Sequence, residues 1–156
     1  MTILSDTQRD AVFAAIIDAA ETAVLPRFQN LAEHEIGSKT SPSDLVTIAD
    51  REAEALLTAS LTKILPGSVV VGEESVSADP GVLKAIDGDA PVWIVDPVDG
   101  TRNFANGQTP FCVMVALAVG GITVAAWIWR PIDSEMVVAL RDEGAQLFEG
   151  NTNNSR

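Results

Sequence analysis

The fold depends first on residues 111–129, which read FCVMVALAVGGITVAAWIW and contain no charged side chain. This run approaches the roughly 20 residues that cross a bilayer as one helix. Gly120 and Gly121 divide it, however, and both halves are rich in Val and Ile, which favours two strands joined by a two-residue turn. We therefore predict a buried β-hairpin. Because both strands are apolar throughout, we also expect the sheet to be covered on both faces.

Helical patterns dominate the part of the chain that precedes this hairpin. Ser5 and Gln8 resemble a capping box, and apolar residues recur at helical spacing over residues 7–25. A second helix is predicted over about residues 46–65 and is ended by a Pro-Gly pair. The polar residues 30–44 between the two helices are expected to form a loop or short hairpin.

Short apolar runs predict further strands at residues 69–71, 92–95 and 136–140, with residues 75–91 as a loop or short helix. Two helices followed mainly by strands favour an α/β layered domain with helices packed on a sheet. We assign one domain to residues 1–150 and a polar tail, NTNNSR, to residues 151–156.

Composition limits the possible partners. The chain has 156 residues, of which 47% are hydrophobic, so it can bury a sizeable core. With 22 acidic against 10 basic residues, its net charge of −12 argues against nucleic acid and anionic membranes, and is compatible with cations or with anionic substrates reached through them. The single cysteine and an N-terminus unlike a signal peptide lead us to expect a cytoplasmic protein.

Three acidic residues follow apolar strands. Glu73 comes after VVVG, Asp96 after WIV, and Asp99 is expected in the turn beyond. Carboxylates held close together repel one another unless a cation neutralises them, and oxygen ligands of this kind suit Mg²⁺. In a two-metal site the ions lie ~3.5–4 Å apart, and Asp96, followed by a proline, is the best candidate for a ligand that they share.

Gly100 and Thr101 follow these acids and mark a possible helix start. Amides in the first turn of such a helix would face the same pocket and bind phosphate, and the Thr101 hydroxyl could hold a bound water. The alternative is that Thr101 is only an N-cap, and that Asp96 and Asp99 belong to an ordinary Pro-Asp-Gly turn.

GEES at residues 72–75, followed by WIVDPVDGTRNF at residues 93–104, resembles the first two signatures of the inositol monophosphatase family. These are Mg²⁺-dependent, lithium-sensitive phosphomonoesterases of the fructose-1,6-bisphosphatase-like superfamily. SPSDLVTIAD at residues 41–50 is similar to the start of the second helix in that family. The resemblance implies an α-β-α-β-α layered sandwich, of which this chain would form the N-terminal portion, with two helices packed on a mainly antiparallel sheet.

The resemblance also implies a role for each matching residue. A complete site would hold two or three Mg²⁺ ions, and the ligands supplied by this chain would be Glu73, Asp96, Asp99 and the backbone carbonyl of Val98. Glu73 and Thr101 would orient the nucleophilic water, and Asp50 would hydrogen-bond Thr101.

Further positions in the site follow from the same resemblance. The amides of Gly100 and Thr101 would receive the phosphate. Lys39 matches a basic position near the site, whereas Glu74 is not a ligand in the family pattern. Arg102 stands where many members carry a small polar residue; we expect it to pair with an acid at the pocket rim, and its effect on substrate choice is left open.

A later family signature, a Trp-Asp pair whose aspartate completes the second metal site, is absent from residues 1–156. The chain therefore resembles the N-terminal part of a family member, and the sequence leaves open whether it is a fragment, a truncated product or a stand-alone relative. We expect hydrolysis of a small phosphomonoester, first of all inositol 1-phosphate, by metal-activated water in a homodimer. The alternatives are a catalytically incomplete metal-binding half-domain, or a relative acting on histidinol phosphate, a sugar bisphosphate or a nucleotide 3′-phosphate.

Overall fold

The computed structural model describes residues 3–39, 41 and 45–150, so the predicted polar tail lies outside the described residues. Its main sheet has six strands in the order β3-β4-β5-β6-β7-β8, and β1 and β2 form a separate antiparallel pair. The strands are β1 (Ile36–Ser38), β2 (Leu45–Thr47), β3 (Val69–Gly72), β4 (Val92–Asp99), β5 (Cys112–Val119), β6 (Ile122–Arg130), β7 (Glu135–Leu140) and β8 (Gly144–Glu149). The sheet is mainly antiparallel, as predicted, because only β3 and β4 run parallel to each other.

The helices also follow the predicted order. The α-helices are α1 (Asp6–Ala19), α2 (Ile48–Ile64), α3 (Glu73–Ala78) and α4 (Thr101–Ala105). The other helical segments are the π-helix η1 (Ala20–Val24) and the 3₁₀-helices η2 (Leu25–Arg27), η3 (Glu33–Glu35) and η4 (Pro80–Asp87). The predicted capping box begins α1, since Ser5 N donates to Gln8 Oε1 at 2.9 Å and Gln8 N to Ser5 Oγ at 3.2 Å. None of the helices within the described residues is long and apolar enough to span a membrane.

The second helix begins two residues later than predicted. Val46 and Thr47 belong to β2, where they pair with Gly37 and Ile36 of β1. Thr47 then caps α2, because its hydroxyl accepts the N–H of Ala49 at 3.2 Å. The predicted loop or short hairpin is thus a hairpin, although residues 40 and 42–44 of its connection lie outside the described part of the chain.

The apolar run forms the predicted hairpin of β5 and β6. Gly120 and Gly121 make the turn with φ of 56° and 74°, left-handed values that other residues adopt only with strain. The side chains of Trp93, Trp127 and Trp129 are buried in the core.

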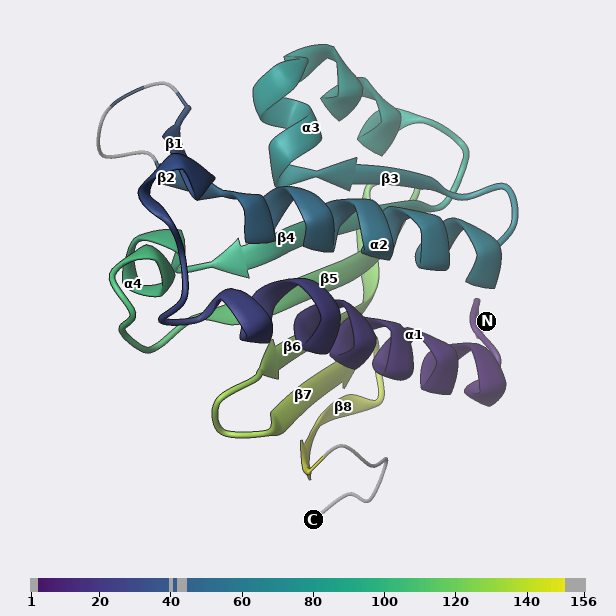
Figure 1. The fold of residues 1–156 in the computed structure, drawn as a ribbon. Coiled ribbons are helices and arrows are strands. Elements are labelled where there is room, and N and C mark those ends of the chain that lie inside the picture. The colour runs from purple at the N-terminus through teal and green to yellow at the C-terminus, as the bar shows by residue number, and fades with distance from the viewer. Residues whose placement is uncertain (1–2, 40, 42–44, 151–156) are drawn as a thin grey trace.

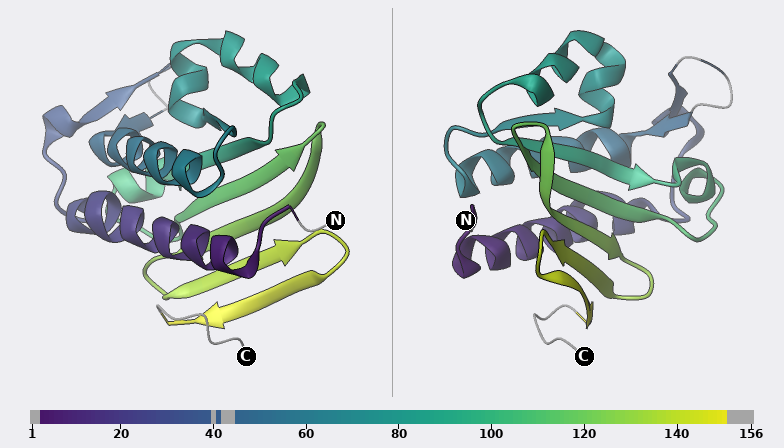
Figure 2. Two further views of the ribbon diagram at one scale, coloured as in Figure 1. Left: turned by 90° about the vertical axis from the view of Figure 1, so that its right-hand side faces the viewer. Right: turned by 180° about the vertical axis from the view of Figure 1, so that it is seen from behind.

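The elements form two layers, with α1 and α2 lying across one face of the main sheet (Figure 1). Figure 2 shows the opposite face of β4 to β8 from behind, with no helix drawn across its centre. Side chains on that face are only half-buried: Ile94, Met114, Ala116, Ala126, Ile128 and Val137. The expectation of a sheet covered on both sides is therefore wrong for the described residues, because their long helices cover one face only.

The parallel strands β3 and β4 position the acidic residues. Gly72 is in register with Val95, so the residues that follow them, Glu73 and Asp96, are neighbours at one end of the sheet. β4 extends to Asp99 instead of ending near Val95, because Asp99 pairs with Cys112 after a register shift. Asp99 is thus the last residue of a strand and does not lie in the turn beyond it.

Candidate active site

One cavity of about 250 Å³ is lined by most of the predicted metal-binding and phosphate-binding residues. Its lining consists of Leu45, Glu73, Asp96, Val98, Asp99, Gly100, Thr101 and Arg102. These residues come from β2, the start of α3, the end of β4 and the start of α4. The three predicted acidic ligands therefore face the same small space.

Asp96 is the most strongly perturbed acid of this cavity. Burial, together with the neighbouring carboxylates of Glu73, Asp99 and Asp50, raises the pKa of its carboxyl to about 8. Its Oδ1 atom is buried without a hydrogen-bond partner among the described residues. An acid with an unpartnered buried oxygen and acidic neighbours is a group that a cation would stabilise in its charged form.

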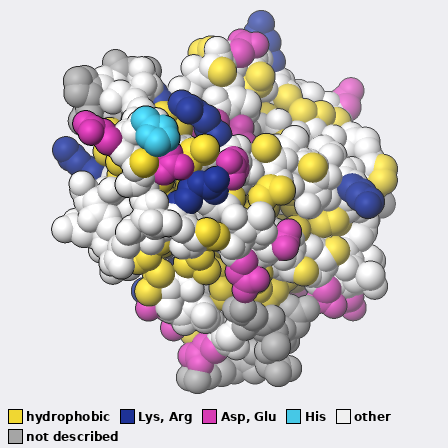
Figure 3. All heavy atoms as spheres, viewed as in Figure 1, with side chains coloured by type: hydrophobic (Ala, Val, Ile, Leu, Met, Phe, Trp, Pro, Cys, Tyr) yellow, Lys and Arg dark blue, Asp and Glu magenta, His cyan; other side chains and the backbone are white. Residues whose placement is uncertain are grey.

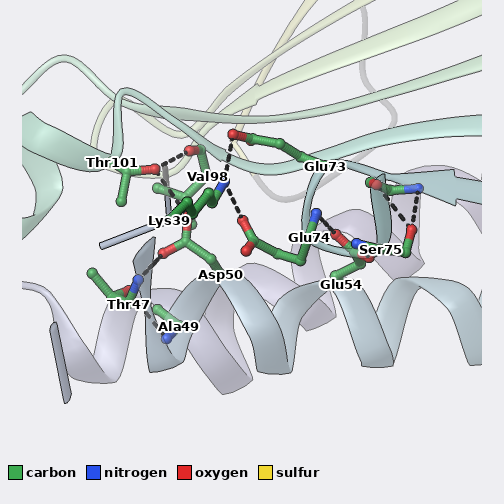
Figure 4. Close-up of polar contacts among 11 residues, drawn as sticks. Lys39, Thr47, Ala49, Asp50, Glu54, Glu73, Glu74, Ser75, Val98 and Thr101 are labelled. Atoms are coloured by element: carbon green, nitrogen blue, oxygen red, sulfur yellow. Dashed lines mark hydrogen bonds and ion pairs between the residues drawn. The ribbon is translucent and has the colours of Figure 1, made fainter. Parts of the chain in front are cut away.

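Lys39 places a positive charge beside Glu73. Its Nζ lies 2.7 Å from Glu73 Oε1 and 2.9 Å from Glu74 Oε1, and its side chain is only 7% exposed. Figure 4 shows Lys39 reaching between the two glutamates. Burial alone would lower the pKa of Lys39, but the two carboxylates outweigh it and raise the pKa above its ordinary value. Lys39 therefore lies beside Glu73, which lines the cavity.

Asp50 contacts Thr101 as predicted. Asp50 is fully buried at the start of α2, and its Oδ2 accepts the N–H of Thr47 at 2.8 Å and its hydroxyl at 2.7 Å. The Thr101 hydroxyl lies 2.9 Å from Asp50 Oδ1 and 2.8 Å from the carbonyl oxygen of Val98. Because a hydroxyl has one hydrogen, these two oxygens compete for it. Burial raises the pKa of Asp50, and its hydrogen bonds oppose that shift.

Gly100 connects β4 to α4 in a backbone shape that excludes most other residues. Its φ is 86°, and a Cβ atom there would lie 3.0 Å from the carbonyl oxygen of Pro110. Thr101 is the first residue of α4 and not its N-cap, so the alternative reading of Thr101 is wrong. Its side chain instead binds Val98 and Asp50, which leaves the first-turn amides of α4 without partners from within that helix.

Arg102 lines the rim of the cavity and is exposed. Among the described residues it forms no ion pair, so the expected pairing with an acid at the rim is not observed there. On the face viewed in Figure 3, basic side chains are mixed with acidic ones and form no extended patch in the coloured part.

The donor set suits a hard cation, although the acids are not gathered as a finished ligand cluster. Carboxylate and carbonyl oxygens are the ligands that Mg²⁺ prefers, and it typically takes one or two carboxylates together with water and phosphate. Within residues 3–39, 41 and 45–150, no three His, Cys, Asp or Glu side chains are arranged to hold one ion. A cation bound here would therefore draw on Asp96 with one neighbouring acid, and would compete with Lys39 for Glu73.

Sequence reasoning missed Glu54. It lies one helical turn after Asp50 on α2 and is 8% exposed. Its Oε2 accepts the N–H of Glu74 at 2.7 Å and its Oε1 that of Ser75 at 2.9 Å. A second acid at i+4 on the apolar side of a helix was the available signal, since an acid placed there needs a buried partner.

Comparison with known proteins identifies the family. The model of the inositol monophosphatase family matches residues 6–156. The chain belongs to this family. It is 40% identical over 114 residues to an inositol-1-monophosphatase of Mycobacterium bovis, which covers 73% of this chain and 39% of that protein. It is also 36% identical over 110 residues to the Nus factor SuhB of Escherichia coli K12, which covers 70% of this chain and 39% of that protein.

The fold agrees with solved structures of family members. The extragenic suppressor protein SuhB of Bartonella henselae superposes with a TM-score of 0.75 at 28% identity, covering 93% of this chain and 52% of that one. The layered α/β fold predicted from the sequence is therefore confirmed. The chain spans between about two fifths and one half of the length of these relatives.

Proposed function

We propose that this chain carries the cation-binding and phosphate-binding part of a Mg²⁺-dependent phosphatase that hydrolyses a small phosphomonoester, with inositol 1-phosphate as the first candidate. The observation that carries the proposal is Asp96, whose buried oxygen has no partner in the described structure and whose pKa is raised to about 8 by burial and by Glu73, Asp99 and Asp50. Family membership supports the chemistry, and the mycobacterial relative is named an inositol-1-monophosphatase.

The proposed ligands are Glu73, Asp96, Asp99 and the carbonyl of Val98, for two or three Mg²⁺ ions in a complete site. Bound there, Mg²⁺ would neutralise the phosphoryl oxygens and make a water more acidic. The Val98 carbonyl keeps one lone pair for this purpose even while it accepts the Thr101 hydroxyl, because a carbonyl oxygen has two.

The remaining roles belong to side chains and amides of this chain. Asp50 holds the Thr101 hydroxyl at 2.9 Å, so Thr101 can orient a water with its lone pairs, and Glu73 accepts the proton of that water. The first-turn amides of α4, with Gly100 placed by its left-handed backbone, bind the phosphate. Lys39 compensates negative charge beside Glu73, and Arg102 faces the substrate from the rim.

Substrate choice and catalytic completeness are separate parts of the proposal. Histidinol phosphate, a sugar bisphosphate or a nucleotide 3′-phosphate would fit the same phosphate-binding chemistry. A half-domain that binds cations without turnover is the second candidate, and one relative is named as a Nus factor and not as a phosphatase. The homodimer and the cytoplasmic location remain predictions.

Phosphate release from inositol 1-phosphate at rising Mg²⁺ tests the proposal, together with calorimetric binding of inorganic phosphate. We expect phosphate binding that requires Mg²⁺ and is lost in Asp99→Asn, while the exposed Asp89→Asn serves as a control. Turnover by the 156-residue chain alone should be close to background, because the family's later Trp-Asp signature is absent from it. Phosphate binding that ignores both Mg²⁺ and Asp99→Asn would contradict the proposal. Strong turnover lost in Asp99→Asn would show that this half suffices for catalysis.

A further inference from the structure

Glu54 joins helix α2 to the segment that carries Glu73. Its two carboxylate oxygens accept the consecutive amides of Glu74 and Ser75, at 2.7 and 2.9 Å, from a side chain that is almost fully buried. Figure 4 shows this carboxylate beneath the first turn of α3. Holding the amide of Glu74 fixes the peptide plane that follows Glu73. The orientation of the Glu73 side chain toward Asp96 and Lys39 therefore depends on Glu54.

The glycine at position 72 is a second observation that concerns the position of the Glu54 carboxylate. The φ and ψ of Gly72 are −104° and 155°, an extended shape that any residue adopts, so backbone strain does not require glycine. A Cβ atom on Gly72 would instead lie within 3.0 Å of the carboxylate carbon and both oxygens of Glu54. Glycine at this position therefore leaves room for the Glu54 carboxylate.

Glu54 is buried beside two other acidic residues, so its carboxylate is repelled by theirs. Glu54 is an acid placed close to the acidic pair Glu73 and Glu74, with which Lys39 forms ion pairs. Charged acceptors form stronger hydrogen bonds to amides than neutral ones, which offsets the repulsion only while both amides are aimed at the carboxylate. The arrangement is thus sensitive to small changes at Glu54 or Gly72.

We propose that Glu54 is a positioning residue that sets the place of the Glu73 and Glu74 carboxylates, and through Glu73 the cation affinity of the cavity. The part concerning cation affinity rests on the proposed function. Because residues that orient metal ligands typically change metal affinity 10- to 100-fold when altered, we expect Glu54→Gln to raise the Kd for Mn²⁺ about tenfold. The amide group of glutamine offers one acceptor and presents N–H donors to the second backbone amide.

Two further variants separate positioning from a general loss of stability. Gly72→Ala should weaken Mn²⁺ binding in the same way, because its methyl group displaces the Glu54 carboxylate. When Gly72→Ala is combined with Glu54→Ala, it should weaken Mn²⁺ binding by a smaller factor than it does alone, because the carboxylate that its methyl group would collide with is gone. Glu52→Gln is the matched control on the same helix, since Glu52 is half-exposed and pairs with Arg27 at 2.9 Å.

A second readout requires no metal. Lys39 is buried between the two glutamates, whereas Lys63 and Lys84, the other two lysines of the chain, are exposed. Labelling of folded protein with an amine-reactive reagent, followed by mass spectrometry, should modify Lys39 slowly in the unaltered chain and at least severalfold faster in Glu54→Gln. Lys63 and Lys84 are internal controls, because a difference in reagent activity or in global folding would change their labelling rates as well.

Weaker Mn²⁺ binding and faster Lys39 labelling in Glu54→Gln, with Glu52→Gln unchanged, is the expected result. Unchanged Lys39 labelling in Glu54→Gln would overturn the inference. So would an unchanged Kd in a chain that does bind Mn²⁺. If the unaltered chain binds no Mn²⁺, the proposed function fails, and with it the part of the inference on cation affinity. The labelling result then decides by itself whether Glu54 positions the two carboxylates.

Discussion

The ammonium of Lys39 lies 2.7 Å from Glu73 Oε1, a contact between residues 34 positions apart that joins the end of β1 to the start of α3. Glu73 is also the first of the three carboxylates proposed as cation ligands. Lys39 and a divalent cation would therefore share one carboxylate, and the stability of the chain should respond to both.

We expect Lys39→Gln to lower the free energy of unfolding by about 1–3 kcal/mol without Mg²⁺, because it removes the positive charge that pairs with both Glu73 and Glu74. Excess Mg²⁺ should restore more of the loss in this variant than it adds to the unaltered chain. Urea denaturation with and without Mg²⁺ measures both effects, and Lys63→Gln is the exposed control. Equal Mg²⁺ effects in Lys39→Gln and in the unaltered chain would contradict a shared carboxylate.

The contact between Thr101 and Asp50 makes a second prediction. Thr101→Val removes the hydroxyl that reaches Asp50 Oδ1 and should cost about 1–3 kcal/mol of stability, since a buried acceptor is left unpaired. Thr101→Ser keeps the hydroxyl and should cost clearly less. Denaturant midpoints of the two variants provide the comparison, and a serine variant as unstable as the valine variant would show that packing of the methyl group matters more.

The stability of the metal-free chain should depend on pH. The pKa of Asp96 is about 8 in the folded chain, against an ordinary value of 3.8, so between these values the folded state binds a proton that the unfolded state has lost. Stability should consequently fall as the pH rises from about 4 to about 8. Melting temperatures in the presence of a chelator should show this slope, and it should be smaller in Asp96→Asn. Burial also raises the pKa values of Asp50 and Glu74, so part of the slope should persist.

The turn of the central hairpin is testable by stability alone. Gly121 has φ of 74°, and Gly121→Val should cost roughly 1–2 kcal/mol through left-handed strain. Apart from its two chain neighbours, no described residue has a heavy atom within 4 Å of the position that a Cβ atom would take there, so a Cβ atom would meet open space. Gly121→Asn should be milder, because asparagine tolerates this conformation. Thermal unfolding of the two variants measures the difference. Equal losses of stability in Gly121→Val and Gly121→Asn would argue against backbone strain as the cause.

The sequence predicted those parts of the fold that depend on local pattern. The capping box at Ser5, the helix-ending Pro66 and the glycine pair at the hairpin turn are local signals, and each lies where it was expected. The extension of β4 to Asp99 was missed because it depends on pairing with Cys112, a contact that no local pattern reports. β8 was missed because its alternation is weak and its residues are largely exposed.

Site residues that belong to a short sequence motif were predictable from the sequence. Site residues whose contacts lie far away in the sequence were harder to predict. Asp96 and Thr101 were found from a short motif. Lys39 and Glu54 act through residues 20 or more positions away, so only the folded chain shows what they contact. The sequence also did not predict that the sheet face opposite α1 and α2 is only half-buried. An apolar pattern indicates that a face is suited to burial, but it does not indicate which segment covers that face.

Divalent-cation binding by the unaltered chain and by Asp96→Asn, measured by titration calorimetry with Mg²⁺ and Mn²⁺, tests the central claim most directly. Asp96→Asn should fold at least as well as the unaltered chain, because burial already disfavours the charged form of Asp96 and asparagine carries no charge at any pH. We predict binding by the unaltered chain and by the control Asp89→Asn, with an affinity at least about tenfold lower in Asp96→Asn, since asparagine offers one neutral oxygen in place of an anionic pair. Equal affinities in the unaltered chain and Asp96→Asn, or no binding by either, would contradict the assignment of this cavity as a cation site.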